Sequence, residues 1–215
     1  MYTCADCTVV ACGRGEREKL PKNCPMREEE KMEELFKRYA EPENHAFFVQ
    51  SAAVEGEGYG EWPRLRETME LCRKMGYQKI GLAFCKGLHR EAKIVASLLR
   101  REGFEVVSVI CKTGGFWKES AGIPREAQID PQAREVMCNP IAQAEFLNGQ
   151  NTEFNIELGL CVGHDSLFYK YSRALVTTLV AKDRALANNP CGAIYCAEGY
   201  CKERLSLTDT SDRRR

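Results

Sequence analysis

Leu-Gly-Leu-Cys-Val-Gly-His-Asp, from Leu158 to Asp165, is the stretch from which the fold of this chain can be inferred. The apolar run over residues 155–160 leads into glycine, cysteine and a polar turn. A buried parallel strand ends in this way when it delivers a side chain to the edge of a sheet. Two earlier runs also end in cysteine, residues 79–85 at Cys85 and residues 104–111 at Cys111. Ligands of open α/β sheets bind outside the carboxyl ends of the strands, so these thiols are expected to face one crevice.

Strand and helix patterns alternate around this stretch. A strand over 79–85, a helix over 90–102 and a strand over 104–111 form a βαβ unit of about thirty residues, with parallel strands and a right-handed crossover. A further helix, strand, helix and strand are expected at 141–147, 155–161, 164–172 and 174–181. We expect strand 155–161 to pair beside the first strand, at the switch point of the sheet. The predicted fold class is therefore α/β, a Rossmann-like three-layer domain with a mostly parallel sheet.

The N-terminal leader carries the spacing C-x2-C-x4-C-x11-C-P, formed by Cys4, Cys7, Cys12 and Cys24. A C-x2-C turn lets two thiolates bind one metal centre, and four cysteines in so short a leader indicate a metal. Structural zinc usually takes two close pairs of ligands, which this leader lacks. A cysteine followed by proline is typical of ferredoxin-type cluster sites. We therefore favour a [4Fe-4S] cluster here, with zinc as the alternative.

The chain divides into a cysteine-rich leader over 1–26, an α/β domain with N-terminal helices over 27–205, and a disordered tail over 206–215. The N-terminal helices are expected at 27–39, 44–54 and 62–75, the second capped by Asn44 and ended by the glycines at 56 and 58. The irregular stretch 112–135 follows a strand end and is expected to be a lid over the crevice.

A second centre is predicted where the strands end. Cys85, Cys111 and Cys161 are expected to share it with Cys138, which lies in a loop before Asn-Pro. The plainer alternative is that all four are buried thiols, because free cysteine is among the most buried residue types. His164 has two interpretations: it acts as a proton donor or an extra metal ligand, or it only lies next to the residue that begins a helix. Lys112 is the other candidate proton donor.

Two further features are less decisive. The spacing C-x4-C-x4-C near the C-terminus is compatible with a metal site or with a share in the crevice, and it involves Cys191, Cys196 and Cys201. On a regular helix these three thiols would not share one face. After the last strand, Lys182-Asp183-Arg184 places charges at the same edge as the strand-end cysteines.

Composition excludes several classes of protein. The 215 residues include 31 basic and 31 acidic ones, so nothing favours nucleic acid or an anionic membrane as a partner. No apolar run approaches the ~20 residues of a transmembrane helix. Cys4 and Cys7 stand where a signal peptide would be apolar, so we expect a cytoplasmic protein. In that compartment the twelve cysteines are expected to be ligands or catalysts rather than disulfides.

Several of these motifs together resemble a known family. The leader, Ala83-Phe84-Cys85, the stretch Cys138 to Asn148 and the stretch Gly159 to Phe168 resemble an uncharacterised metal-binding protein family of anaerobic bacteria and archaea. The resemblance implies a cytoplasmic protein with bound metal and assigns no reaction. In addition, Gly-Leu-Cys-Val-Gly-His-Asp is similar to a cluster-binding turn of carbon monoxide dehydrogenases and hybrid-cluster proteins. That likeness implies a cluster ligand at Cys161.

Three functions fit these patterns. The first is a redox enzyme, an oxidoreductase that uses iron–sulfur clusters, in which the leader cluster passes electrons to the second centre and that centre acts on a small molecule. The second is a non-catalytic carrier or sensor of a metal or cluster. The third is a zinc-stabilised module whose crevice binds an organic ligand. The expected partners are a small molecule, an electron-transfer protein, or both. The residues leave the oligomeric state open.

Overall fold

The computed structural model describes residues 1–205, which fall into two units, residues 1–61 and a larger unit that begins at Trp62. The first two long helices belong to the same unit as the cysteine leader. The leader boundary at residue 26 stays a prediction. The tail predicted over 206–215 lies outside the described residues.

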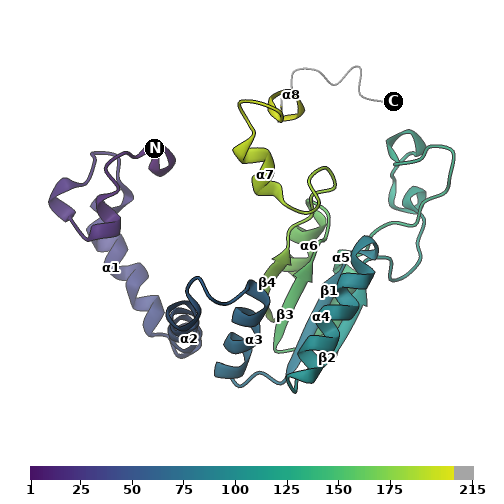
Figure 1. Ribbon diagram of the computed structural model, residues 1–215, viewed down its shortest axis with the longest axis horizontal. Helices are drawn as coiled ribbons and strands as arrows, with labels where there is room; N and C mark the ends of the chain where they lie inside the picture. The colour runs from purple at the N-terminus through teal and green to yellow at the C-terminus, as the bar shows by residue number, and fades with distance from the viewer. Residues whose placement is uncertain (206–215) are drawn as a thin grey trace. The chain divides into compact units, whose positions relative to one another are not determined.

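The smaller unit begins with four short 3-10 turns, η1 (Cys4–Asp6), η2 (Ala11–Arg14), η3 (Arg17–Lys19) and η4 (Pro25–Arg27). Helix α1 (Glu29–Lys37), the turn η5 (Arg38–Ala40) and helix α2 (Pro42–Gly58) follow (Figure 1). Few side chains of this unit are buried, and they include Ala11, Leu20 and Val54. So small an apolar core contributes little to stability.

Helix α2 corrects two expectations. It begins at Pro42 rather than after Asn44, because proline suits the first helical position, where its missing N–H has no partner to lose. Asn44 does not cap the helix, and its Nδ2 instead donates to Glu41 Oε2 at 2.8 Å. The helix also runs through Gly56 to Gly58, since a glycine costs a helix only about 1 kcal/mol relative to alanine.

The larger unit is built on a four-stranded sheet with all neighbours parallel (Figure 1). The strands are β1 (Lys79–Phe84), β2 (Glu105–Ile110), β3 (Phe154–Leu158) and β4 (Leu175–Val180), and their order is β2-β1-β3-β4. The predicted α/β class and the pairing of the third strand beside the first are confirmed. Because the order reverses between β1 and β3, the switch point lies between them.

Helices cover the sheet on two faces. Helix α4 (His89–Arg101) packs on β1 and β2, and helix α5 (Pro140–Gly149) packs on the same strands and on α6 (His164–Tyr171). Ala83 of β1 belongs to one buried cluster with Leu147 of α5, whereas the next residue, Phe84, lies against His89 of α4. Successive residues of a strand point to opposite faces. Helices α4 and α5 therefore lie on opposite sides, as in a three-layer domain.

Helix α3 (Arg64–Lys74) precedes the sheet and is tied to its far strand. The Arg64 Nε donates to the backbone oxygen of Thr178 at 2.8 Å, and Cys72 of the same helix is fully buried, as its apolar helix face predicts. Two short helices, α7 (Pro190–Tyr195) and α8 (Lys202–Leu205), follow β4. Within residues 1–205, none of the helices combines the length and the apolar character needed to cross a membrane.

Segment 112–135, the expected lid, contains only the short turns η7 (Lys118–Ala121) and η8 (Arg125–Ala127). Its two ends are joined by an isolated antiparallel β-bridge between Trp117 and Val136 and by an ion pair between Lys118 and Glu135. In Figure 1 the segment projects beyond the ends of β1 and β2. Its role as a lid stays a prediction.

Candidate metal centre

Three cysteines that follow strands, together with Cys138, are delivered to one edge of the sheet. Cys85 follows β1 and Cys111 follows β2, and each continues the ladder: Cys85 N–H donates to the oxygen of Leu158 at 3.1 Å, and Cys111 N–H to that of Phe84 at 2.9 Å. Cys161 lies in the turn between β3 and α6, and Cys138 precedes the N-cap of α5. The strands end before the predicted cysteines, so these side chains stand just beyond the sheet.

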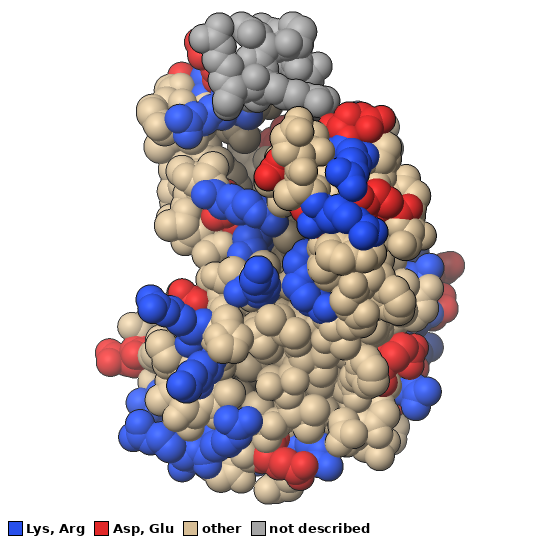
Figure 2. Space-filling model, turned by 90° about the vertical axis from the view of Figure 1, so that its right-hand side faces the viewer, with Lys and Arg blue, Asp and Glu red and all other residues tan. Residues whose placement is uncertain are grey.

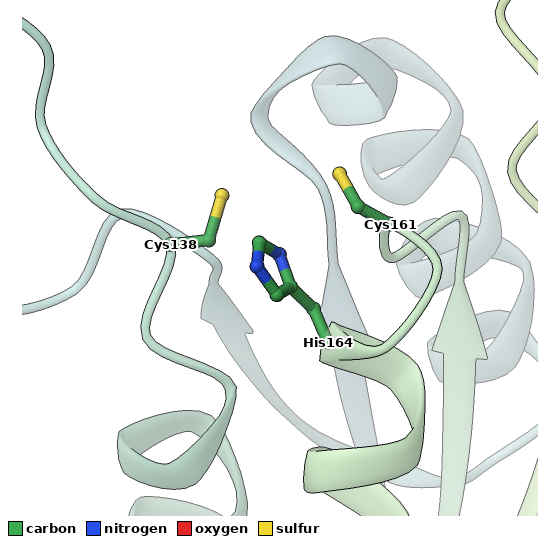
Figure 3. Close-up of side chains that lie close together, drawn as sticks. All are labelled: Cys138, Cys161 and His164. Atoms are coloured by element: carbon green, nitrogen blue, oxygen red, sulfur yellow. The ribbon is translucent and has the colours of Figure 1, made fainter. Parts of the chain in front are cut away.

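Cys138, Cys161 and His164 form the tightest group of metal-ligating side chains among residues 1–205. The two sulfurs and a ring nitrogen of His164 all lie within 4.8 Å of one another. Figure 3 shows Cys138 approaching from the loop before α5, while Cys161 and His164 come from the turn and first residue of α6. The Nδ1 of His164 is buried and has no hydrogen-bond partner in the described part of the chain. A buried imidazole nitrogen beside two thiols is suited to bind a metal.

Cys111 connects the remaining thiols to this group. Its thiol is within hydrogen-bonding reach of both Cys138 and Cys85, and Cys85 and Cys138 pack against the buried cluster that contains it. The hydrogen bonds with Cys138 and Cys85, together with burial, raise the pKa of Cys111, so this thiol keeps its proton. The hydrogen bond from Cys111 in turn lowers the pKa of Cys85 and of Cys138 to about 5. Thiolates, the form that binds metal, are thereby favoured at two of the four positions.

Positive groups surround these sulfurs. The Nη2 of Arg184 donates to Cys161 Sγ at 2.8 Å, and the backbone N–H of Lys86 donates to Cys111 Sγ at 3.3 Å. After the hydrogen bond from Cys111, the charge of Lys112 is a further cause of the low pKa of Cys138. The charge of Lys182 acts in the same way on Cys85. Such electropositive surroundings stabilise thiolates and the negative charge of a thiolate-bound metal.

The structure thus brings together Cys85, Cys111, Cys138, Cys161 and His164, with Lys112 beside them. Their service as ligands or proton donors stays a prediction. Sequence reasoning noted charges after β4 without assigning a role to Arg184, because only the tertiary fold shows that its side chain reaches Cys161. It also missed Glu157, a carboxyl fully buried on β3 near this turn, for which the only signal was an acid within an apolar strand.

The leader cysteines are arranged more loosely. Cys4, Cys7 and Cys24 line a cavity of about 250 Å³, whereas Cys12 does not line it. Within residues 1–61, no three of these thiols come within 4.8 Å of one another. A tetrahedral zinc ion with Zn–S bonds of ~2.3 Å needs sulfurs about 3.8 Å apart, which is closer than any three of these thiols lie to one another.

The C-terminal cysteines do not join either group. Cys191 and Cys196 are exposed and Cys201 is buried. In the part of the chain that the structure describes, they form no three-membered group with ligand atoms within 4.8 Å. Their contribution to a metal site therefore gains no support from the structure.

Comparison with known proteins places this chain in a family. A family model described as "Protein of unknown function (DUF1847)" matches residues 24–179, which is most of the chain. The chain belongs to this family. The matched range of this DUF1847 member contains Cys24 and all five residues of the sheet-edge group, but not Cys4, Cys7 or Cys12. An uncharacterised protein of Methanocaldococcus jannaschii is 42% identical over 202 residues, covering 94% of this chain and 97% of its own length. The predicted membership in an uncharacterised family is confirmed.

Proposed function

We propose that this chain is a metalloprotein whose working centre is bound at the carboxyl edge of the sheet. The observation that carries the proposal is the convergence of Cys138, Cys161 and His164, whose ligand atoms lie within 4.8 Å of one another. Cys85 and Cys111 stand directly beside them. Thiolate and imidazole together suit iron and zinc, and they suit magnesium or calcium poorly.

An iron–sulfur cluster is the occupant that we favour. Four thiols and an imidazole exceed the four ligands of a tetrahedral ion, and cysteine and histidine together ligate one known class of cluster. The N–H groups and cations directed at the sulfurs are of the kind that set the potential of such clusters. When bound, a cluster would supply one-electron transfer.

The residues of this chain would support a redox role in defined ways. The backbone N–H of Lys86 and the guanidinium of Arg184 fix the orientation of Cys111 and Cys161. Lys112 holds a proton next to Cys138, and its Nζ is itself held by the oxygen of Val136 at 2.5 Å. For His164, the short distances to both thiols favour the ligand role over the proton donor. A cluster in the leader would be the electron source, and an electron-transfer protein would supply it in turn.

A second candidate is a non-catalytic carrier or sensor of a single metal ion. The compactness of the group favours it, because ligands within 4.8 Å of one another need only a small contraction to reach tetrahedral spacing. The sheet-edge cysteines other than Cys111 are also partly exposed, as transfer of an ion to a partner would require. A zinc ion held permanently by the same group would instead give the third function, a zinc-stabilised module whose crevice binds an organic ligand.

Metal analysis of the full-length protein, purified without oxygen, separates the candidates. We expect iron with acid-labile sulfide and visible absorption for the cluster, and zinc without either for the carrier. Cys161→Ser should lose the equivalent of one centre, whereas Cys191→Ser, which changes an exposed thiol outside the group, should retain the full amount. Equal metal in wild type and Cys161→Ser would show that these cysteines are ordinary buried thiols.

A further inference from the structure

A surface cleft of about 640 Å³ opens beside the sheet-edge thiols. It lies between the ends of β1 and β2 and the segment that precedes α5, and its lining comprises Lys86, Ile110, Lys112, Gly115, Arg134, Glu135 and Val136. Clefts of this size bind small organic molecules rather than single ions. Figure 2 shows Lys and Arg side chains gathered in the upper middle of the face of the molecule that includes these elements.

The charge of the lining is positive. The lining has three cationic residues, Lys86, Lys112 and Arg134, and one acidic residue, Glu135, whose carboxylate is already paired with Lys118. The backbone N–H of Asp130 donates to the other oxygen of Glu135 at 2.6 Å. The lining therefore presents three cations and an acid whose oxygens are both engaged, which favours an anionic ligand.

Arg134 is held in place by its neighbours. Its guanidinium carbon lies 4.2 Å from the centroid of the Trp117 ring, and its Nε is 3.8 Å from Glu119 Oε1. Glu119 also pairs with Arg125 at 3.2 Å, so it neutralises Arg134 only in part. An arginine stacked on an aromatic ring loses little freedom when its planar edge binds a carboxylate or phosphate.

Two residues that line the cleft also lie next to the sheet-edge cysteines. Lys86 lines the cleft and donates its backbone N–H to Cys111 Sγ. Lys112 lines the cleft and directly follows Cys111 in the chain. A molecule in the cleft would thus lie next to the sulfurs without passing through the core.

We propose that this cleft binds a small organic anion, bearing a carboxylate or a phosphate, and holds it next to the sheet-edge cysteines. Lys86 and Arg134 hold the anionic end, and Ile110 and Val136 contact its apolar part. The role of the anion at the centre rests on the proposed metal site, but its binding to the cleft does not.

Calorimetry with three probes of equal shape tests the charge preference. Benzoate is an anion, benzamide is neutral and benzamidine is a cation, so the three probes differ mainly in charge. Inorganic phosphate tests whether the cleft also accepts a phosphate group. We expect benzoate and phosphate to bind, benzamide to bind more weakly and benzamidine not to bind. The double variant Lys86→Gln/Arg134→Gln should weaken benzoate binding by about tenfold or more, because it removes two charge-assisted contacts. Lys93→Gln/Arg101→Gln, which removes two exposed charges of α4, should leave binding unchanged.

The outcomes separate this proposal from the metal centre. Metal content is measured on every variant, and Cys161→Ser is titrated with the same probes. Benzoate binding that survives in metal-depleted Cys161→Ser supports the cleft even if the metal assignment fails. Benzamidine binding as tight as that of benzoate, an unchanged affinity in Lys86→Gln/Arg134→Gln, or no binding of either anion at tens of millimolar would each overturn the proposal.

Discussion

Glu157 provides the sharpest quantitative test of the fold around the site. Its side chain is only 1% exposed, and its Oε1 accepts a hydrogen bond from the backbone N–H of Leu160, in the turn that carries Cys161. Burial raises the pKa of this carboxyl from 4.5 to about 7, against the opposing hydrogen bonds from Leu160 and Thr178. The charge of Asp165 raises it further, and that of Lys182 lowers it.

A raised pKa means that the folded protein binds this proton more tightly than the unfolded chain. The resulting stability is fully present below pH 4.5, the ordinary value, and is lost as the pH rises through about 7. The difference between the two pKa values corresponds to roughly 3 kcal/mol in the free energy of unfolding. Glu157→Gln keeps an oxygen that can accept from Leu160 and removes the charge. It should therefore be more stable than wild type by up to roughly 3 kcal/mol at pH 8, and by less than about 1 kcal/mol at pH 5.

Urea denaturation of both proteins at pH 5 and pH 8, without oxygen, measures this difference. Glu91→Gln, at an exposed acid in the first turn of α4, is the matched control and should follow wild type in its pH dependence. If Glu157→Gln loses stability between pH 5 and pH 8 as steeply as wild type does, the carboxyl is not buried as described.

Three further predictions follow from named contacts. Arg184→Gln removes the contact with Cys161 at 2.8 Å and should weaken metal binding about 10- to 100-fold in a chelator competition, whereas Arg90→Gln, exposed on α4, should not. Gly81→Ala places a methyl group against Asn155 Oδ1 and should lower the free energy of unfolding by about 1–3 kcal/mol. The control Gly149→Ala, whose methyl group would meet nothing within 4 Å, should change the free energy of unfolding by no more than about 0.5 kcal/mol. Equal changes in the two variants would refute the packing of β1 on β3. Cys7→Ser should lose one centre's worth of metal and make residues 1–26 sensitive to protease, since this unit has few buried apolar side chains; unchanged metal would contradict a leader centre.

The sheet could be predicted because local patterns and chain topology agree. Apolar runs bounded by helix patterns require parallel strands and right-handed crossovers, and only a few orders of four strands remain. The convergence of Cys85, Cys111 and Cys161 follows, because strands paired as Phe84↔Ile110 and Phe84↔Leu158 end at the same level.

Other features depend on side chains that are distant in sequence. The burial of Glu157 depends on β4, whose Thr178 is its partner across the sheet, and no local pattern encodes that pairing. Likewise, the reach of Arg184 to Cys161 depends on the path of the chain after β4. Helix α2 extends past the end that Gly56 and Gly58 predict, because isolated glycines are only mildly unfavourable in a helix.

X-ray absorption at the metal edge of the full-length anaerobic protein tests the central claim most directly. A centre bound by Cys138, Cys161 and His164 should show sulfur ligands near ~2.3 Å and a nitrogen ligand near ~2.0–2.1 Å, and His164→Ala should remove the nitrogen contribution while His45→Ala keeps it. A spectrum with sulfur ligands alone that is identical in wild type and His164→Ala, or a protein without metal, would contradict the account.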